Sequence, residues 1–315
     1  MGKDFGKDFD AVVIGAGVIG LSTAICLQEE GLRVLIRSKL APQESTSMLA
    51  SAMVGPDFAP PGDRTSRWYA ESVRRLTPDV PGVSVLEGRM AARPEGAYPP
   101  GAQRLPGFRD CGPDELPPGF GTAFWLRQTV VDMPPYLRHL TTRFIDGGGE
   151  LVLEPVSSLA EAAQIAPRVA NCAGLGAAAL TGDKSLHPAR GPKIVVENPG
   201  IEHFFLEAPF GPIWAGFIPH GDHVVLGGTY SESDDTTPDP DEEAEIIRLC
   251  AEIEPALATA KVLEHQVGLR PARPQPRLEA EERDGARVVH NYGHGGVGVM
   301  LSWGCAKEAA AMLKG

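Results

Sequence analysis

The chain has 315 residues, of which 43% are hydrophobic and 22% charged, a composition typical of a globular protein with a sizeable core. Its net charge of −12 argues against nucleic acid as the main partner, because phosphate binding needs a basic face. No run of about 18 apolar residues occurs, so we expect no transmembrane helix and no membrane partner. The polar N-terminus, MGKDFGKDFD, predicts no secretory signal.

Cysteine usage bears on compartment and metal binding. The five cysteines are widely spaced, and no C-x-x-C pair occurs. This pattern favours reduced thiols in a cytoplasm and argues against structural zinc. The chain ends in Met-Leu-Lys-Gly, which is not a peroxisomal tripeptide. We therefore expect a cytoplasmic protein without a metal, present as a monomer or a homodimer.

The first predicted elements are a strand, a glycine-rich turn and a helix. An apolar strand over 10–14 leads into Gly15, Gly17 and Gly20, spaced as G-x-G-x-x-G, and residues 17–30 have helical periodicity. Glycines at these positions let a pyrophosphate approach the backbone at a helix N-terminus. In this context the motif predicts the start of a dinucleotide-binding fold.

The second strand of this unit lacks an expected residue. A strand over 33–36 ends at Arg37 and Ser38, where an acidic residue usually holds an adenosine ribose. An arginine at this point also fits the 2′-phosphate of NADP. The segment alone leaves open which dinucleotide is bound.

Further elements follow along the chain. The patterns predict a helix over 65–76, an irregular proline-rich segment over 94–118, a helix capped by Asp132 that runs to 145 with Pro134 and Pro135 in its first turn, and strands over 150–156, 168–172 and 223–226. His220 and His223 flank a Gly-Asp turn and predict a hairpin.

The acidic stretch over 232–245 has two interpretations. A solvated loop followed by a helix, with Asp239 as cap and Pro240 at its first position, places the acids where the helix dipole favours them. A metal site is the alternative, but no second cluster of ligands accompanies the stretch. We therefore expect a capped helix.

The C-terminal segment VVHNYGHGGVGVMLSWGC contains a second glycine-rich turn. A strand over 287–291 runs into the turn at 293–298, and a helix follows to about 313. A nicotinamide dehydrogenase has no need of this second turn, whereas a helix N-terminus suits the pyrimidine edge of a flavin. The turn therefore favours a flavoprotein.

Five motifs together resemble the D-amino acid oxidase family, which is related to glycine oxidase. They are DAVVIGAGVIGLSTA, NCAG, LGGTY, GLRPARPQPRLE and HNYGHGGVGVMLSWGCA, and they occur in order between residues 10 and 312. The resemblance implies FAD as cofactor. It also implies an α/β fold in which a Rossmann-like FAD-binding domain (1–60, 130–185 and 262–315) is interleaved with an α+β substrate domain on an antiparallel sheet (61–129 and 186–261).

The resemblance assigns residues to the cofactor by position. Arg37 matches an arginine of some microbial members, and Ser38 replaces the acid that follows it there, so we expect FAD with a loosely held ribose. The residues implied for FAD are Gly15, Gly17, Val18, Ile19 and Gly20 at the pyrophosphate, Arg37 and Ser38 at the ribose, Ser45, Thr46 and Ser47 near the phosphates, Met53 beside the flavin, Val156 at the adenine, Cys172 and Gly174 by the ribose strand, and Arg270, Gly295, Gly296, Val297, Gly298, Val299 and Met300 along the flavin.

Arg270 is the residue expected to bind the substrate. Its planar guanidinium stays charged and pairs two-to-two with a carboxylate, and the matching arginine does this in the family. The alternative for Arg270 is a structural salt bridge. Arg273 and Arg277 follow in a proline-rich stretch and are expected at the surface or at a domain interface.

Three further positions are read from the family. Gly296 matches the residue whose carbonyl accepts a hydrogen from the substrate amine, and Tyr230 matches a tyrosine that points into the pocket. Gly216 stands where the family has a tyrosine that helps to hold the carboxylate. We expect Gly216 to leave room for a bulky substrate, with Trp214 or Phe217 as an apolar wall. The segment over 203–219 is also shorter than the vertebrate lid.

The sequence therefore predicts an FAD enzyme that converts a D-amino acid, O2 and water to a 2-oxo acid, ammonia and H2O2, with hydride transfer from Cα to flavin N5. Alternative substrates are glycine, an N-methyl amino acid, an acidic D-amino acid or a pathway-specific amino acid. Two other classes stay open at this point: a flavin-binding protein without turnover, and an NADP-linked reductase.

Overall fold

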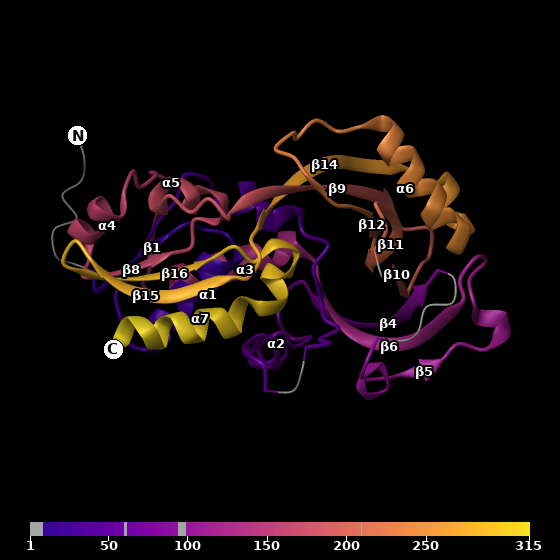
Figure 1. Ribbon diagram of the computed structural model, residues 1–315, viewed down its shortest axis with the longest axis horizontal. Helices are drawn as coiled ribbons and strands as arrows, with labels where there is room; N and C mark the ends of the chain where they lie inside the picture. Colours follow the sequence, from indigo (N-terminus) through magenta and orange to yellow (C-terminus); the bar gives the residue numbers. More distant parts are fainter. Residues whose placement is uncertain (1–8, 60–61, 94–98, 209) are drawn as a thin grey trace.

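The computed structural model describes residues 9–59, 62–93, 99–208 and 210–315. Within these ranges the strands form a six-stranded sheet and a ten-stranded sheet, which lie at opposite ends of an elongated molecule (Figure 1). The long strands β9 and β14 run from the middle of the molecule into the second sheet. The chain crosses between the two sheets several times, as interleaved segments require.

The six-stranded sheet is mostly parallel and has the order β15-β16-β8-β1-β2-β7. Only the pairing of β15 with β16 is antiparallel among its described neighbours. Its strands are β1 (Ala11–Ile14), β2 (Val34–Arg37), β7 (Glu150–Val152), β8 (Arg168–Asn171), β15 (Arg277–Arg283) and β16 (Ala286–Tyr292).

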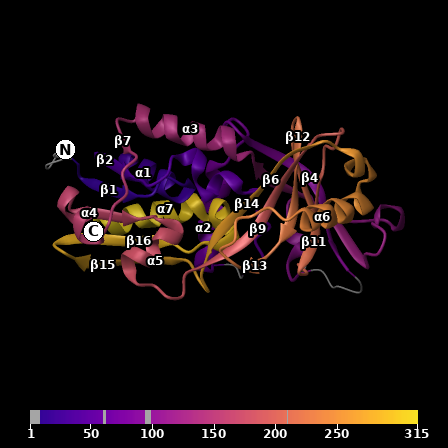
Figure 2. The same cartoon turned by 90° about the horizontal axis from the view of Figure 1, so that it is seen from above.

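Helices cover both faces of this sheet because successive strand residues point to opposite sides. Val13 and Ile36 face a core shared with α1, α3 and α7, whereas Val12 and Leu35 face α4. Helices α1 and α7 lie side by side, with α3 along the outside of α1 (Figure 2). The helices are α1 (Val18–Glu29), α2 (Arg64–Arg75), α3 (Met133–Asp146), α4 (Leu159–Ile165), α5 (Ala177–Thr181), α6 (Pro240–Ile253) and α7 (Gly298–Lys314).

The ten-stranded sheet is mainly antiparallel and has the order β13-β9-β12-β11-β10-β4-β6-β3, with β14 paired to β9 and β5 to β6. Helix α6 packs on one face of this sheet through Ile246 and Cys250. The strands are β3 (Met53–Val54), β4 (Val83–Ala92), β5 (Arg109–Asp110), β6 (Thr122–Val131), β9 (His187–Glu197), β10 (Phe204–Glu207), β11 (Ile213–His220), β12 (His223–Thr229), β13 (Ser231–Glu232) and β14 (Val262–Ala272).

The α/β class and the two glycine-to-helix units agree with the sequence analysis, and two local features differ. The strand expected over 150–156 ends at Val152, because its partner β2 ends opposite at Arg37. Asp132 precedes α3, but its side chain makes no capping hydrogen bond; its carboxylate instead lies 3.9 Å from the Nε2 atom of His223. Burial raises the pKa of Asp132.

Other expected elements have the predicted form. His220 and His223 pair across the β11–β12 hairpin, and the side chain of Asp239 accepts hydrogen bonds from the first turn of α6. The proline-rich segment is irregular where it is described, with β5 and two short 3-10 turns, and 94–98 lies outside the described residues. The range 262–315, expected in the FAD-binding domain, begins with β14, which is hydrogen-bonded into the ten-stranded sheet.

Candidate active site in the cleft between the sheets

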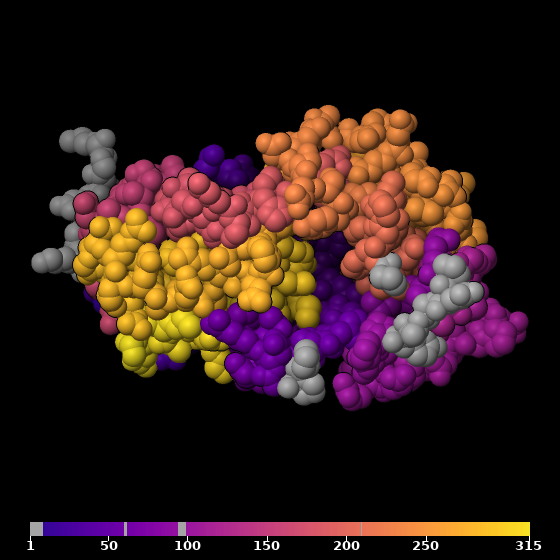
Figure 3. Space-filling view, in the orientation of Figure 1, coloured from indigo at the N-terminus to yellow at the C-terminus, as the bar shows by residue number. Residues whose placement is uncertain are grey.

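A cavity of about 2080 Å³ lies where the two sheets meet. Figure 3 shows its opening as a recess between the C-terminal segment and the strands of the second sheet. The residues expected at the site line this cavity, with Gly20 as the exception. A Cβ at Gly20 would overlap the carbonyl of Gly15, so this glycine allows α1 to pack closely on the first turn.

The first glycine turn exposes backbone to the cavity. Gly15 has φ +102°, and a Cβ there would lie 2.5 Å from the carbonyl oxygen of Cys172. A Cβ at Gly17 would lie 3.1 Å from the Oγ of Ser47. The amide of Val18, the first residue of α1, donates to that same Oγ at 3.0 Å. The helix N-terminus and a neighbouring hydroxyl thus meet at one point, which suits a phosphate.

Arg37 is already paired within the protein. Its guanidinium lies 3.3 Å from a carboxylate oxygen of Glu154 and 3.8 Å from one of Glu161, and its Nε donates to the Glu154 carbonyl at 3.0 Å. A 2′-phosphate would have to compete with both carboxylates for this cation. Ser38 lines the cavity, and its hydroxyl donates to the Leu40 carbonyl at 2.7 Å. This arrangement argues against NADP.

The second glycine turn lines the same cavity as the first. Gly293 and Gly295 have φ of +81° and +53°, and α7 begins at Gly298. Two buried polar atoms of lining residues, Nε2 of His294 and Oδ1 of Asn291, have no partner within the described chain. Burial lowers the pKa of His294 to about 4, so its ring is neutral at physiological pH. Unpaired polar atoms beside a helix N-terminus fit the polar edge of a bound flavin.

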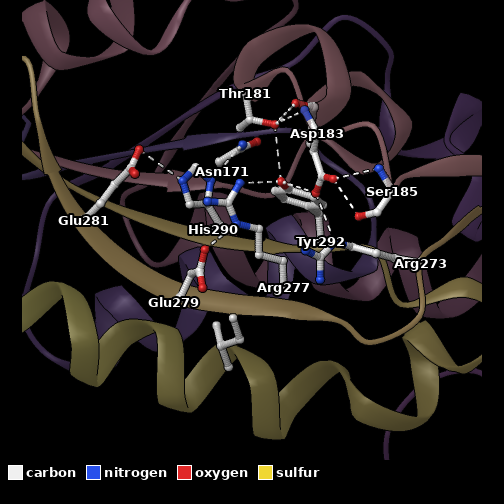
Figure 4. A network of polar contacts seen from close by, with 12 residues as sticks. Asn171, Thr181, Asp183, Ser185, Arg273, Arg277, Glu279, Glu281, His290 and Tyr292 are labelled. Atoms are coloured by element: carbon white, nitrogen blue, oxygen red, sulfur yellow. Dashed lines mark hydrogen bonds and ion pairs between the residues drawn. The ribbon is translucent and has the colours of Figure 1, made fainter.

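A network of polar contacts holds this turn in place (Figure 4). The Tyr292 hydroxyl donates to Asp183 at 3.0 Å and accepts from Arg277 at 2.8 Å, and Arg273 donates to Asp183 at 2.9 Å. Hydrogen bonds from Ser185, with those from Tyr292 and Arg273, hold the pKa of Asp183 far below its usual value. Arg273, just after β14, therefore binds the segment before β9 directly, and Arg277 of β15 is joined to it through Tyr292.

Arg270 on β14 lines the cavity, and its hydrogen-bond partners among the described residues are backbone carbonyls, not carboxylates. Its Nη1 donates to the carbonyls of Arg190 at 3.1 Å and Thr229 at 3.3 Å. A Cβ at Gly191 would overlap the guanidinium, so the arginine lies directly on that glycine. Burial lowers the pKa of Arg270, yet an arginine keeps its charge in proteins. A partly buried cation with no acidic partner among the described residues has the chemistry to bind an anion.

The second glycine turn lies beside this cation. A Cβ at Gly296 would be 3.8 Å from the Cδ of Arg270. Tyr230 also lines the cavity, with half of its surface exposed. The walls contributed by the second sheet are mainly apolar. They include Met53, Met90, Phe124, Leu206, Trp214 and Ile218.

Gly216 lies on β11 and borders the cavity. A Cβ at this position would be 3.7 Å from Cδ1 of Trp214, whose indole packs over Gly228. Phe217 also borders the cavity, but its ring is fully buried and stacks on Phe205 at 5.7 Å, within the core beneath α6. Of the two side chains expected as an apolar wall, the Trp214 indole lies beside Gly216, whereas the Phe217 ring points into the core.

Sequence reasoning missed the residues that seat Arg270. Arg190 and Thr229 supply backbone carbonyls, and Gly191 supplies space. Any residue can supply a backbone carbonyl, so the amino-acid type does not reveal these acceptors. The pairing of β9 with β14 also joins segments about 80 residues apart, which a local pattern cannot show. His294 belongs to the C-terminal glycine-rich motif, and only the burial of its ring beside the cavity marks it as a residue of the site.

The chain belongs to the family described as FAD dependent oxidoreductase (DAO), which it matches over residues 10–312. It is 44% identical to a D-amino-acid oxidase of Rubrobacter xylanophilus, covering 96% of this chain and 95% of the relative. It is 41% identical to a D-amino-acid oxidase of Streptomyces coelicolor, covering 97% of each. The structure of glycine oxidase from Geobacillus kaustophilus superposes with a TM-score of 0.83 at 18% identity, over 97% of this chain and 94% of that one.

The family identifies the cofactor as FAD and the chain as an oxidoreductase. The alternative of an NADP-linked reductase is therefore wrong, in agreement with the ion pairs that occupy Arg37. The glycine turns, the Ser47 hydroxyl and the unpaired atoms of Asn291 and His294 form a cavity whose groups fit FAD. Within the described residues, none of the helices combines the length and apolarity needed to span a membrane.

Proposed function

We propose that this enzyme oxidises D-amino acids, consuming O2 and water and releasing a 2-oxo acid, ammonia and H2O2. The observation that carries the proposal is the partly buried guanidinium of Arg270, which lacks an acidic partner within the described chain and lies beside the Gly296 turn in the FAD cavity. The names of the Rubrobacter and Streptomyces relatives support the same reaction.

The protein's own contribution is binding and orientation. FAD, when bound, would accept the hydride, and with it the two electrons, that leaves the substrate Cα. Arg270 binds the substrate carboxylate with its planar fork, and the Gly296 carbonyl accepts a hydrogen from the amine. Two anchors on either side of Cα fix its orientation, and the apolar walls exclude water from the reacting centre.

The cavity favours substrates with large neutral side chains. The charged residues that line the described cavity, other than Arg270, are Arg37, Lys39 and Glu44. Arg37 ends β2 and the other two follow it, at the nucleotide end. A second carboxylate on an acidic D-amino acid would find apolar walls at the substrate end. Gly216, beside Trp214, carries no side chain to narrow the site. Glycine and N-methyl amino acids would leave most of this apolar space unfilled.

The experiment is to measure peroxide release from a panel of D-, L- and N-methyl amino acids and glycine. We expect the highest kcat/KM for bulky neutral D-amino acids, and little activity with D-aspartate. Anaerobic bleaching of the flavin by the same substrates distinguishes an enzyme from a flavin-binding protein without turnover. Bleaching by L-amino acids alone, or by none of the panel, would contradict the proposal.

We also propose a cytoplasmic location and a monomeric or homodimeric state. All five cysteines are free, and four of them are buried, which fits a reducing compartment. We propose a division in which residues 1–60, 130–185 and 262–315 chiefly bind FAD and the remainder binds substrate. Size-exclusion chromatography of the holoenzyme tests the oligomeric state.

A further inference from the structure

One carboxylate on the far side of the second sheet contacts both residues that hold Arg270. Glu242, in the first turn of α6, accepts from Nη1 of Arg190 with both oxygens, at 2.9 and 2.7 Å. It also accepts from the Thr229 hydroxyl at 2.7 Å. Arg190 and Thr229 are the two residues whose backbone carbonyls accept hydrogen bonds from Arg270.

The two sets of contacts lie on opposite faces of the sheet. Successive residues of a strand point to opposite sides, so the side chain of Arg190 turns away from the side occupied by Gly191. Arg270 lies on Gly191, which lines the cavity, and Arg190 reaches Glu242 on α6. Any coupling between Glu242 and Arg270 therefore passes through the backbone of β9 and β12.

The pair of Arg190 and Glu242 is well protected from water. Their side chains are only 11% and 12% exposed, so solvent screens the ion pair little. Helix α6 begins at Pro240 and is capped by Asp239, so Glu242 lies in its first turn. The positive end of the helix dipole stabilises a carboxylate at this position. The carboxylate is thus a fixed point to which two strands are attached.

Arg190 extends the same attachment to the loop before α6. Its Nη2 donates to the Thr237 carbonyl at 3.1 Å. The neighbouring residue Thr236 lines the cavity. Loss of the Arg190–Glu242 pair would therefore free both the acceptors of Arg270 and a part of the cavity wall.

We propose that Glu242 is a positioning residue for substrate binding: by joining Arg190 to Thr229 it holds their carbonyls where they orient the Arg270 guanidinium. The inference rests on the proposed function of Arg270 as the anchor of the substrate carboxylate. It assigns Glu242 no contact with substrate or cofactor.

The test compares Glu242→Ala and Glu242→Gln with the matched control Glu243→Gln on the same turn. Glu243 pairs with His265 at 2.7 Å, whereas the ion pair of Arg190 is with Glu242. Two probes are titrated into each holoenzyme and followed by flavin absorbance: an aryl carboxylate and the corresponding carboxamide. The KM of a neutral D-amino acid and the retention of FAD are measured alongside.

We expect Glu242→Ala to raise KM and the Kd of the carboxylate roughly tenfold, because the charge-assisted contact depends on the orientation of the fork. Glu242→Gln should give a smaller rise, since its amide oxygen still accepts from Thr229. The Kd of the carboxamide, the FAD content and the control should not change. In an Arg270→Ala background, Glu242→Ala should have no further effect on the carboxylate.

Three outcomes would overturn the inference: an equal loss for the two probes, an undiminished effect without Arg270, or no effect of either Glu242 variant. If Glu242→Ala does not fold, Thr229→Val removes one of the two attachments while keeping the carbonyl, and should raise the carboxylate Kd alone. If Arg270→Ala itself leaves carboxylate affinity unchanged, the proposed function fails. If Arg270→Ala loses affinity for the carboxylate but the Glu242 variants do not, only the inference about Glu242 fails.

Discussion

The two ends of the cavity are built in different ways. At the nucleotide end, backbone from short contiguous segments lines the cavity, with the turn at Gly15 and the start of α1 as the main parts. At the substrate end, a single cation from β14 is held by carbonyls from β9 and β12. One end depends on the absence of side chains, and the other depends on the placement of one side chain.

The difference predicts which amino-acid substitutions each end of the cavity tolerates. A backbone cradle is insensitive to most neighbouring side chains, but a Cβ at a closely packed glycine disrupts it. A partly buried cation without an acidic partner is sensitive to its own identity and to the groups that orient it. Substitutions at the first end should therefore act on FAD, and those at the second on substrate.

The largest effect is expected from Gly15→Ala. The added Cβ would lie 2.5 Å from the Cys172 carbonyl oxygen, at a residue with φ +102°, so the turn must distort. We expect the purified variant to contain no flavin. Gly31→Ala is the matched control, since Gly31 has φ +82° but no atom within 4 Å of the new Cβ. Flavin retention by Gly15→Ala would refute the backbone cradle.

Next in size is the effect of Arg270→Ala. Removing one partner of a buried charge pair should cost about 2–5 kcal/mol in kcat/KM. FAD should stay bound, because the cradle lies at the other end. Arg270→Lys should also perform poorly, since a point charge cannot reproduce the fork. Steady-state kinetics with a neutral D-amino acid give the measurement, and near-normal kcat/KM in either variant would remove Arg270 from the site.

An intermediate effect is expected from Gly216→Tyr, which restores the side chain usual in the family. A phenol that bonds the carboxylate should lower KM for D-alanine by the equivalent of roughly 1.5–3 kcal/mol. The new Cβ would lie 3.0 Å from the Gly227 carbonyl oxygen, so the strand pair must give slightly, and 3.7 Å from Cδ1 of Trp214. The ring beside Trp214 would take up cavity space, and KM for bulky substrates should rise.

The matched variant for this position is Gly216→Phe, which supplies the ring without the hydroxyl. It should raise KM for bulky substrates without helping D-alanine. A lower KM for small and large substrates alike in Gly216→Tyr would show that Gly216 does not make room. No change for either would place the position away from the substrate.

The smallest effect concerns Ser38→Asp at the nucleotide end. A carboxylate there would offer the ribose a charge-assisted acceptor and should tighten FAD by about 1–2 kcal/mol. The gain is reduced if the new side chain pairs with Arg37, although Glu154 and Glu161 already neutralise that cation. Retention of FAD on dialysis is the measurement, with Ser38→Asn as the uncharged control. Weaker retention in Ser38→Asp would contradict this account of the ribose end.

Much of the fold could be predicted because its signals are local. The strand and helix around Gly15, the helix capped by Asp239 and the hairpin at His220 each depend on residues within one or two turns. The strand expected over 150–156 was too long because its end is set by the partner strand β2, which is distant in sequence. The missing cap at Asp132 has a similar origin, since its side chain lies near His223 of another element instead of bonding the first turn of α3.

The sequence by itself determined the cofactor, because the glycine turns and the family motifs are made of neighbouring residues. It also predicted Arg270 as the cation proposed to anchor the substrate, from a motif and from the chemistry of a single side chain. Only the tertiary structure decided how that cation is seated. The carbonyls of Arg190 and Thr229, the space above Gly191 and the carboxylate of Glu242 meet at Arg270 through strand pairing across the sheet. Pairing between distant strands is set by the packing of the whole core, so these contacts carry no local signal.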